Sequence, residues 1–92
     1  MEVEVRVHGR LAELLNVTHL KVDLGDDSKL GDLIRSLDKL NPRFSQVLLD
    51  SSGRLKQDYI ILVNGESVED LDRRLSNGDV VDILPPAVGG AQ

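Results

Sequence analysis

The chain has 92 residues, a net charge of -5 and no cysteine, and these facts exclude several classes of function. The length is that of one small domain. The negative charge argues against nucleic acid as a partner. Without cysteine there is no disulfide, thiolate metal site or cysteine nucleophile, and a cytoplasmic location is the simplest expectation. There is no apolar signal segment and no run of about 18 apolar residues, so we expect no membrane contact.

The first half of the chain predicts two strands and one main helix. Residues 2–7 alternate valines with charged residues, which indicates a half-buried strand. Residues 10–16 fit a short helical turn and residues 17–24 a second strand, paired antiparallel with the first because the connection is short.

The main helix is expected over residues 29–41, where Asn41-Pro42 ends it, with Asp27 or Ser28 as its N-cap. Its apolar residues recur at the spacing of one helix face. They are Leu30, Leu33, Ile34, Leu37 and Leu40.

The second half predicts a short turn over residues 43–49 and a polar loop over 50–58. A strand over 59–63 then ends in Asn-Gly, a strong hairpin signal, and residues 66–68 form its partner. Residues 69–79 are expected to form a helical turn and a loop before the last strand, which runs to Pro85.

One helix face that must cover one sheet face gives a two-layer α+β domain. We expect a mixed sheet in the β-grasp (ubiquitin-like) arrangement, with the first and last strands parallel and central. Residues 1–84 would form this domain, and residues 85–92 a flexible, extended C-terminal tail.

The strand pattern also predicts an apolar patch on the face of the sheet away from the helix. If Ile61 and Val63 point toward the helix, Ile60 and Leu62 point away from it, and Leu84 joins them from the last strand. Exposed apolar clusters often mark partner sites. The alternatives are a loop 50–58 that covers this face, or scattered exposed aliphatic residues.

The last eight residues, PPAVGGAQ, are hard to explain as part of a fold. Pro85 and Pro86 cannot donate to a sheet, so the chain should leave the sheet there as an extended arm. Ala87, Val88 and Gly89 would continue a thin tail toward Gly90, suited to a narrow cleft in another protein. The plain alternative is an ordinary frayed terminus.

Residues 59–90 resemble the C-terminal half of the ubiquitin-like sulfur carriers and small modifier proteins. This family includes the small subunit of molybdopterin synthase and the archaeal small modifiers. The shared motifs are VNG at 63–65, NGDVVDILP at 77–85 and PAVGG at 86–90. The N-terminal half agrees with the family in layout more than in motif.

The resemblance implies that this protein is a substrate and carrier, not an enzyme, and that Gly90 bears the working carboxylate. A ubiquitin-activating-type adenylyltransferase would use ATP to adenylate it, and a sulfurtransferase would convert it to a thiocarboxylate that donates sulfur. In molybdopterin synthase the tail would complete the active site of a large subunit. In the modifier branch the glycine would be joined to a lysine amine. A non-covalent β-grasp interaction module remains a further alternative.

The sequence departs from the family pattern at Ala91-Gln92, which follow the second glycine. Removal by a JAMM-type zinc protease would free the Gly90 carboxylate; a cloning remnant or a tail that is never trimmed are the alternatives. No bound cofactor or metal is expected, because His8 and His19 show no ligand spacing and fit solvated surface histidines.

Overall fold

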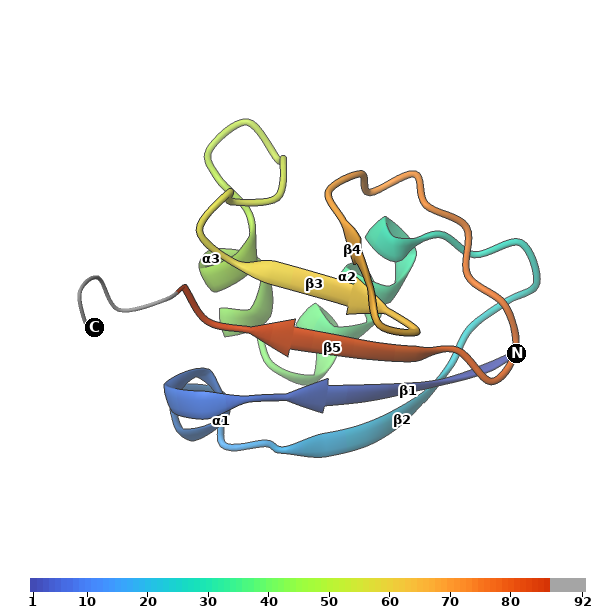
Figure 1. Ribbon diagram of the computed structural model, residues 1–92, viewed down its shortest axis with the longest axis horizontal. Helices are drawn as coiled ribbons and strands as arrows, with labels where there is room; N and C mark the ends of the chain where they lie inside the picture. Colours follow the sequence, from blue (N-terminus) through green and yellow to red (C-terminus); the bar gives the residue numbers. More distant parts are fainter. Residues whose placement is uncertain (87–92) are drawn as a thin grey trace.

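Five strands and three helices make up the part of the chain that the computed structural model describes, residues 1–86 (Figure 1). In chain order they are β1 (Glu2–Val7), α1 (Gly9–Leu15), β2 (His19–Asp23), α2 (Leu30–Leu40), α3 (Arg43–Leu48), β3 (Ile60–Val63), β4 (Glu66–Val68) and β5 (Val80–Leu84). None of the helices in this range is long and apolar enough to cross a lipid bilayer.

The strands form one mixed sheet in the order β2-β1-β5-β3-β4. The first and last strands, β1 and β5, pair in parallel at its centre, and the other neighbours are antiparallel. Helices α2 and α3 lie together on one face of the sheet (Figure 1). This is the predicted β-grasp arrangement, which is confirmed.

The core lies between α2 and the inner face of the sheet. Four residues of α2 face it, namely Leu30, Leu33, Ile34 and Leu37, and all are buried. The fifth residue of the predicted stripe, Leu40, is at the last position of the helix and is 69% exposed. The stripe therefore ends one turn earlier than the sequence predicted.

The Asn-Gly hairpin is fixed by Asn64 as well as by its backbone. Asn64 and Gly65 both have positive φ, as a two-residue hairpin requires. The Asn64 amide donates to the buried carboxylate of Asp79 at 2.8 Å and its oxygen accepts from the Val80 amide at 2.9 Å. The VNG and NGD motifs thus hold the β3–β4 turn against the start of β5.

The predicted N-cap of α2 and the predicted helical turn after β4 were both wrong, and contacts between the start of α2 and the segment after β4 explain both. The N-cap of α2 is Lys29, neither Asp27 nor Ser28. Its first amides, those of Leu30 and Gly31, donate to backbone carbonyls at positions 73 and 71, each at 2.9 Å. The helical turn predicted within residues 69–79 is instead an extended segment with turns, because carbonyl groups of this segment accept hydrogen bonds from α2.

We predict that truncating Leu37 to alanine lowers the free energy of unfolding by about 2–5 kcal/mol, because the side chain is fully buried and its loss leaves a cavity. Leu40→Ala, on the same helix but exposed, should change it by less than about 0.5 kcal/mol. Urea unfolding followed by circular dichroism measures both. Equal losses for the two variants would contradict this assignment of the core.

Candidate functional site

The chain leaves the sheet after β5 at a point where segments from both ends of the sequence lie together. Strand β5 ends at Leu84, directly before Pro85 and Pro86. The amide of His8, the residue after β1, donates to the Ile83 carbonyl of β5 at 3.0 Å. We call Pro85 and Pro86 the tail root.

Gly9, the first residue of α1, is fitted to the tail root. Its φ is 62°, in the left-handed region. A Cβ at this position would lie 3.1 Å from Cγ of Pro85, which is closer than side chains normally approach. A glycine therefore lets the tail root pack directly against the beginning of α1.

The predicted apolar patch faces away from the helices. Ile60 lies opposite Leu84 in the β3–β5 register and is 44% exposed, and Leu62 is half-buried. Ile61 and Val63 are buried in the core, so the predicted alternation along β3 is confirmed. Loop 50–58 leaves Ile60 exposed. We define Ile60, Leu62 and Leu84 as the apolar patch.

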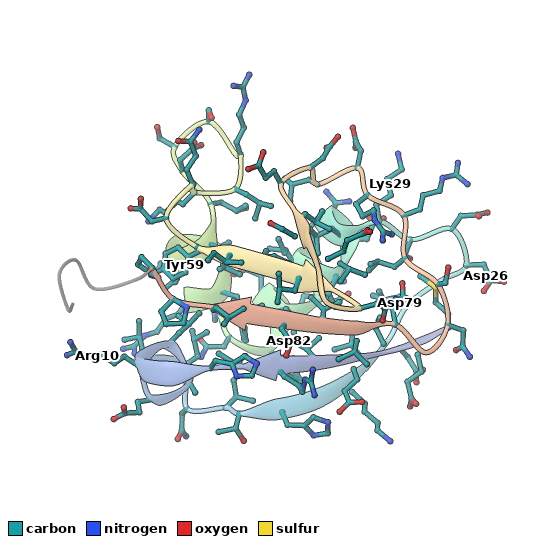
Figure 2. All side chains as sticks on the ribbon, in the orientation of Figure 1. Arg10, Asp26, Lys29, Tyr59, Asp79 and Asp82 are labelled. Carbon is teal, nitrogen blue, oxygen red and sulfur yellow. The ribbon has the colours of Figure 1, made fainter. Side chains whose placement is uncertain are left out.

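Next to the patch, on the same outer face, lies a cluster of three charged or polar side chains. Asp82 points outward from β5 yet is only 6% exposed, because Arg6 and His8 of the β1 side cover it. Arg6 donates twice to its carboxylate, at 2.7 and 2.9 Å, and Nε2 of His8 lies 2.7 Å from the same group. Figure 2 shows Asp82 between β5 and β1.

The hydrogen bonds from Arg6 hold the pKa of Asp82 below its ordinary value. Burial opposes this shift, and the contact with His8 adds to it. The same pair raises the pKa of Arg6. The cluster therefore keeps a carboxylate charged at the edge of an apolar patch, and it joins the two central strands through their side chains.

The two histidines lie at the surface, as the sequence predicted, and each has a partner that the sequence did not predict. Both are about half-exposed, but each contacts a carboxylate on the outer face: His8 meets Asp82, and His19 meets Glu4. Two such pairs do not make a metal site. Among residues 1–86, no group of three or more histidine, cysteine or acidic residues is placed to hold a metal ion.

The residues predicted to carry the chemistry lie outside the part of the chain that the structure describes. Pro85 and Pro86 are described and half-buried. The tail residues Ala87, Val88, Gly89 and Gly90, and the pair Ala91-Gln92, all fall in the range 87–92 that is not described. Their roles, and the division of the chain into domain and tail, stay predictions.

Sequence reasoning missed the Arg6–Asp82–His8 cluster and the role of Gly9. Strand parity does place Arg6 and Asp82 on the same outer face. Strand parity does not give the register of the β1–β5 pair, and that register sets Arg6 directly opposite Asp82. In the sequence, Gly9 indicates only the end of a strand. Its packing against Pro85 could not be predicted, because Pro85 is a neighbour in space but lies at the far end of the sequence.

Comparison with known proteins identifies relatives that match nearly the whole chain. A model of the ThiS family matches residues 5–90. Small archaeal modifier protein 3 from Haloferax volcanii is 31% identical over 93 residues, which cover 98% of this chain and 100% of that protein.

Two solved structures show the same fold. The crystal structure of SAMP1 from Haloferax volcanii superposes with a TM-score of 0.88 at 27% identity, covering 98% of this chain and all of that one. The putative molybdopterin converting factor subunit 1 from Pyrococcus furiosus gives 0.76 at 28% identity, covering 95% and 99% of the two chains. The fold is thus kept at low sequence identity.

We predict that Asp82→Asn lowers the free energy of unfolding near pH 7 by about 1–2 kcal/mol, since charge-assisted hydrogen bonds at a half-exposed arginine are lost. The folded pKa of Asp82 is depressed, so this stabilisation is complete above the unfolded pKa of about 4 and is lost as the pH falls through the folded pKa.

The difference between wild type and Asp82→Asn should therefore shrink as the pH is lowered below about 4. Urea unfolding at a series of pH values measures it. The control is Asp58→Asn, because Asp58 is exposed and forms no ion pair with any described residue. A difference for Asp82→Asn that is constant down to pH 2 would refute the role given to its charge.

Proposed function

The chain belongs to the ThiS family, and we propose that it is a ubiquitin-like sulfur carrier whose Gly90 carboxylate is activated and thiocarboxylated by partner enzymes. The observation that carries the proposal is that the family match runs to Gly90 and so includes both glycines. On this view the protein is a substrate of enzymes and acts in the cytoplasm, as sulfur donor for molybdopterin or a related thiolated product.

The proposed chemistry starts from a carboxylate, which is a poor electrophile until its oxygen becomes part of a leaving group. An adenylyltransferase of the ubiquitin-activating type joins the Gly90 carboxylate to the α-phosphate of ATP and releases pyrophosphate. The terminal sulfur of a sulfurtransferase persulfide then attacks the acyl carbon, and AMP leaves. A thiol cleaves the remaining sulfur–sulfur bond and frees the thiocarboxylate. ATP binds to the partner, not to this chain.

This sequence of steps needs a free carboxylate at Gly90, so Ala91 and Gln92 must be removed first. A protease of the JAMM type is the proposed agent. The end of the family match at Gly90 supports this view, because the two residues that follow are outside the shared pattern. Gly89 would give the clearance that an active site needs around the reacting carbon.

We also propose that partners dock on the apolar patch formed by Ile60, Leu62 and Leu84. The patch is exposed at Ile60 and adjoins the tail root through Leu84 and Pro85. A partner bound there would have the tail within reach of its active site. The large subunit of a molybdopterin synthase is one such partner, and the likeness to the putative converting factor subunit from Pyrococcus furiosus supports it.

A second candidate function is conjugation, in which the activated Gly90 forms an isopeptide bond with a lysine amine of a target protein. The 31% identity to small archaeal modifier protein 3 favours it. Both functions share adenylation, and they differ in the final acceptor. Lysine-linked conjugates in cell extracts that disappear when Gly90 is deleted would point to the modifier.

We predict that protein ending at Gly90, incubated with ATP, the adenylyltransferase and a persulfide donor, gains the mass of one oxygen-to-sulfur exchange. Intact mass spectrometry measures this. Protein that still carries Ala91-Gln92 is the control and should stay unmodified, because its Gly90 has no free carboxylate. If the shorter protein forms no adenylate with any candidate enzyme, the proposal fails in favour of a non-covalent interaction module.

We predict that Ile60→Asp weakens binding of the adenylyltransferase by about tenfold or more, as expected when an apolar contact inside an interface becomes charged. Leu40→Asp is the matched control: Leu40 is also an exposed aliphatic residue, but it lies at the end of α2 on the other face of the sheet. Calorimetric titration measures both. Equal affinity of the two variants for the enzyme would show that the apolar patch is not part of the interface.

A further inference from the structure

We propose that α1 and the tail root together form a second docking surface for the adenylyltransferase, a groove that receives an apolar side chain flanked by a carboxylate. This inference rests on the proposed function, because it describes how the same enzyme holds the carrier. It concerns a surface that adjoins the apolar patch but shares no residue with it, and it assigns a role to α1.

A surface groove of about 580 Å³ opens between α1 and the end of β5. We call it the tail-root groove. Arg10 and Tyr59 lie at the end of the molecule where β5 ends (Figure 2). The residues that line the tail-root groove include Arg10, Glu13, Leu14, Tyr59, Pro85 and Pro86.

Leu14 is the apolar anchor of this groove. Leu11, Ala12 and Leu15 of α1 are buried in the core, so the helix is already held to the domain, and Leu11 also lines the groove. Leu14 adds nothing to that core and remains 49% exposed, beside the apolar rings of the tail root. An exposed leucine in a groove with proline and tyrosine is the kind of surface that a protein partner covers.

The position of the groove indicates which partner would cover it. Two of its lining residues, Pro85 and Pro86, are the root of the tail itself. Pro85 also follows Leu84 of the apolar patch, and a third lining residue, Tyr59, precedes Ile60 of that patch. An enzyme that rests on the patch and encloses the tail must therefore pass over the groove.

Arg10 at the rim of the groove favours an acidic group on the partner. Arg10 is exposed and forms no ion pair with any other residue in the range 1–86. Among the residues that line the groove, Arg10 is the cation and Glu13 the anion. Arg43 does not line the groove, but its guanidinium lies close to α1, where it donates to the Leu14 carbonyl at 3.2 Å. A carboxylate of the partner would pair with Arg10.

The test is calorimetric titration of the adenylyltransferase with protein ending at Gly90 and its variants. Leu14→Ser should raise the Kd about tenfold, because the complex no longer covers a half-exposed leucine. Leu40→Ser, an exposed leucine at the end of α2, is the matched control and should change it less than about twofold. Arg10→Glu should also raise the Kd, and its effect should diminish as salt is added.

The outcomes separate this inference from the proposed function. If the wild type binds and is adenylated but Leu14→Ser binds equally well, the groove is not a docking surface and the proposed function stands. If the enzyme neither binds nor adenylates the wild type, both fail. Circular dichroism of each variant verifies that it is folded; should Leu14→Ser unfold, Leu14→Gln replaces it.

Two other occupants of the groove would overturn the proposal. A second copy of the chain would appear as a concentration-dependent dimer in sedimentation, lost in Leu14→Ser. Residues 87–92 of the same chain would appear as changes in the Leu14 methyl resonances when the protein is truncated after Pro86. The proposal requires a monomer and unchanged Leu14 resonances.

Discussion

The parallel pairing of β1 with β5 is the constraint on which the rest of this structure depends. Parallel strands end at the same edge of a sheet, so the end of β1 and the end of β5 lie side by side. Helix α1 begins where β1 ends, and the tail root begins where β5 ends. Chain segments from the two ends of the sequence therefore meet, and Gly9 allows Pro85 to pack against the start of α1 without a side chain between them. Every proposed contact of the tail is built at this edge.

The outer face of the sheet is divided into two halves by the same strand pair. On the β3 side of β5 it is apolar, with Ile60 and Leu62; on the β1 side it carries Arg6 and His8. Asp82 stands at the boundary and is satisfied by the β1 side chains, so a charge is buried there without cost to the neighbouring patch. A partner that matched only an apolar surface would leave these polar groups poorly solvated. The cluster thus favours partners with polar groups at this position.

Local pattern predicted most of the fold, and contacts between distant residues account for what it missed. The alternation of Val3, Val5 and Val7, the α2 stripe as far as Leu37, and the Asn64-Gly65 turn are set by neighbours in the sequence, and all are found in the structure. The start of α2 is different, because its first amides bond to carbonyl groups at positions 71 and 73. No capping residue before the helix could reveal that. The Arg6–Asp82 pair likewise needs the register of two strands from opposite ends of the chain.

The residues that stabilise this domain and those proposed to act are almost entirely separate sets. The core is made by the inward-facing side chains of the sheet together with buried residues of α1, α2 and α3. The proposed contacts, at Ile60, Leu14 and Arg10, are exposed, so substitutions there change little of the folding free energy. The solved structure of SAMP1 superposes with a TM-score of 0.88 at 27% identity, so the fold is kept at low sequence identity. The core fixes the pairing of β1 with β5, and the proposed contacts are made by exposed side chains outside that core.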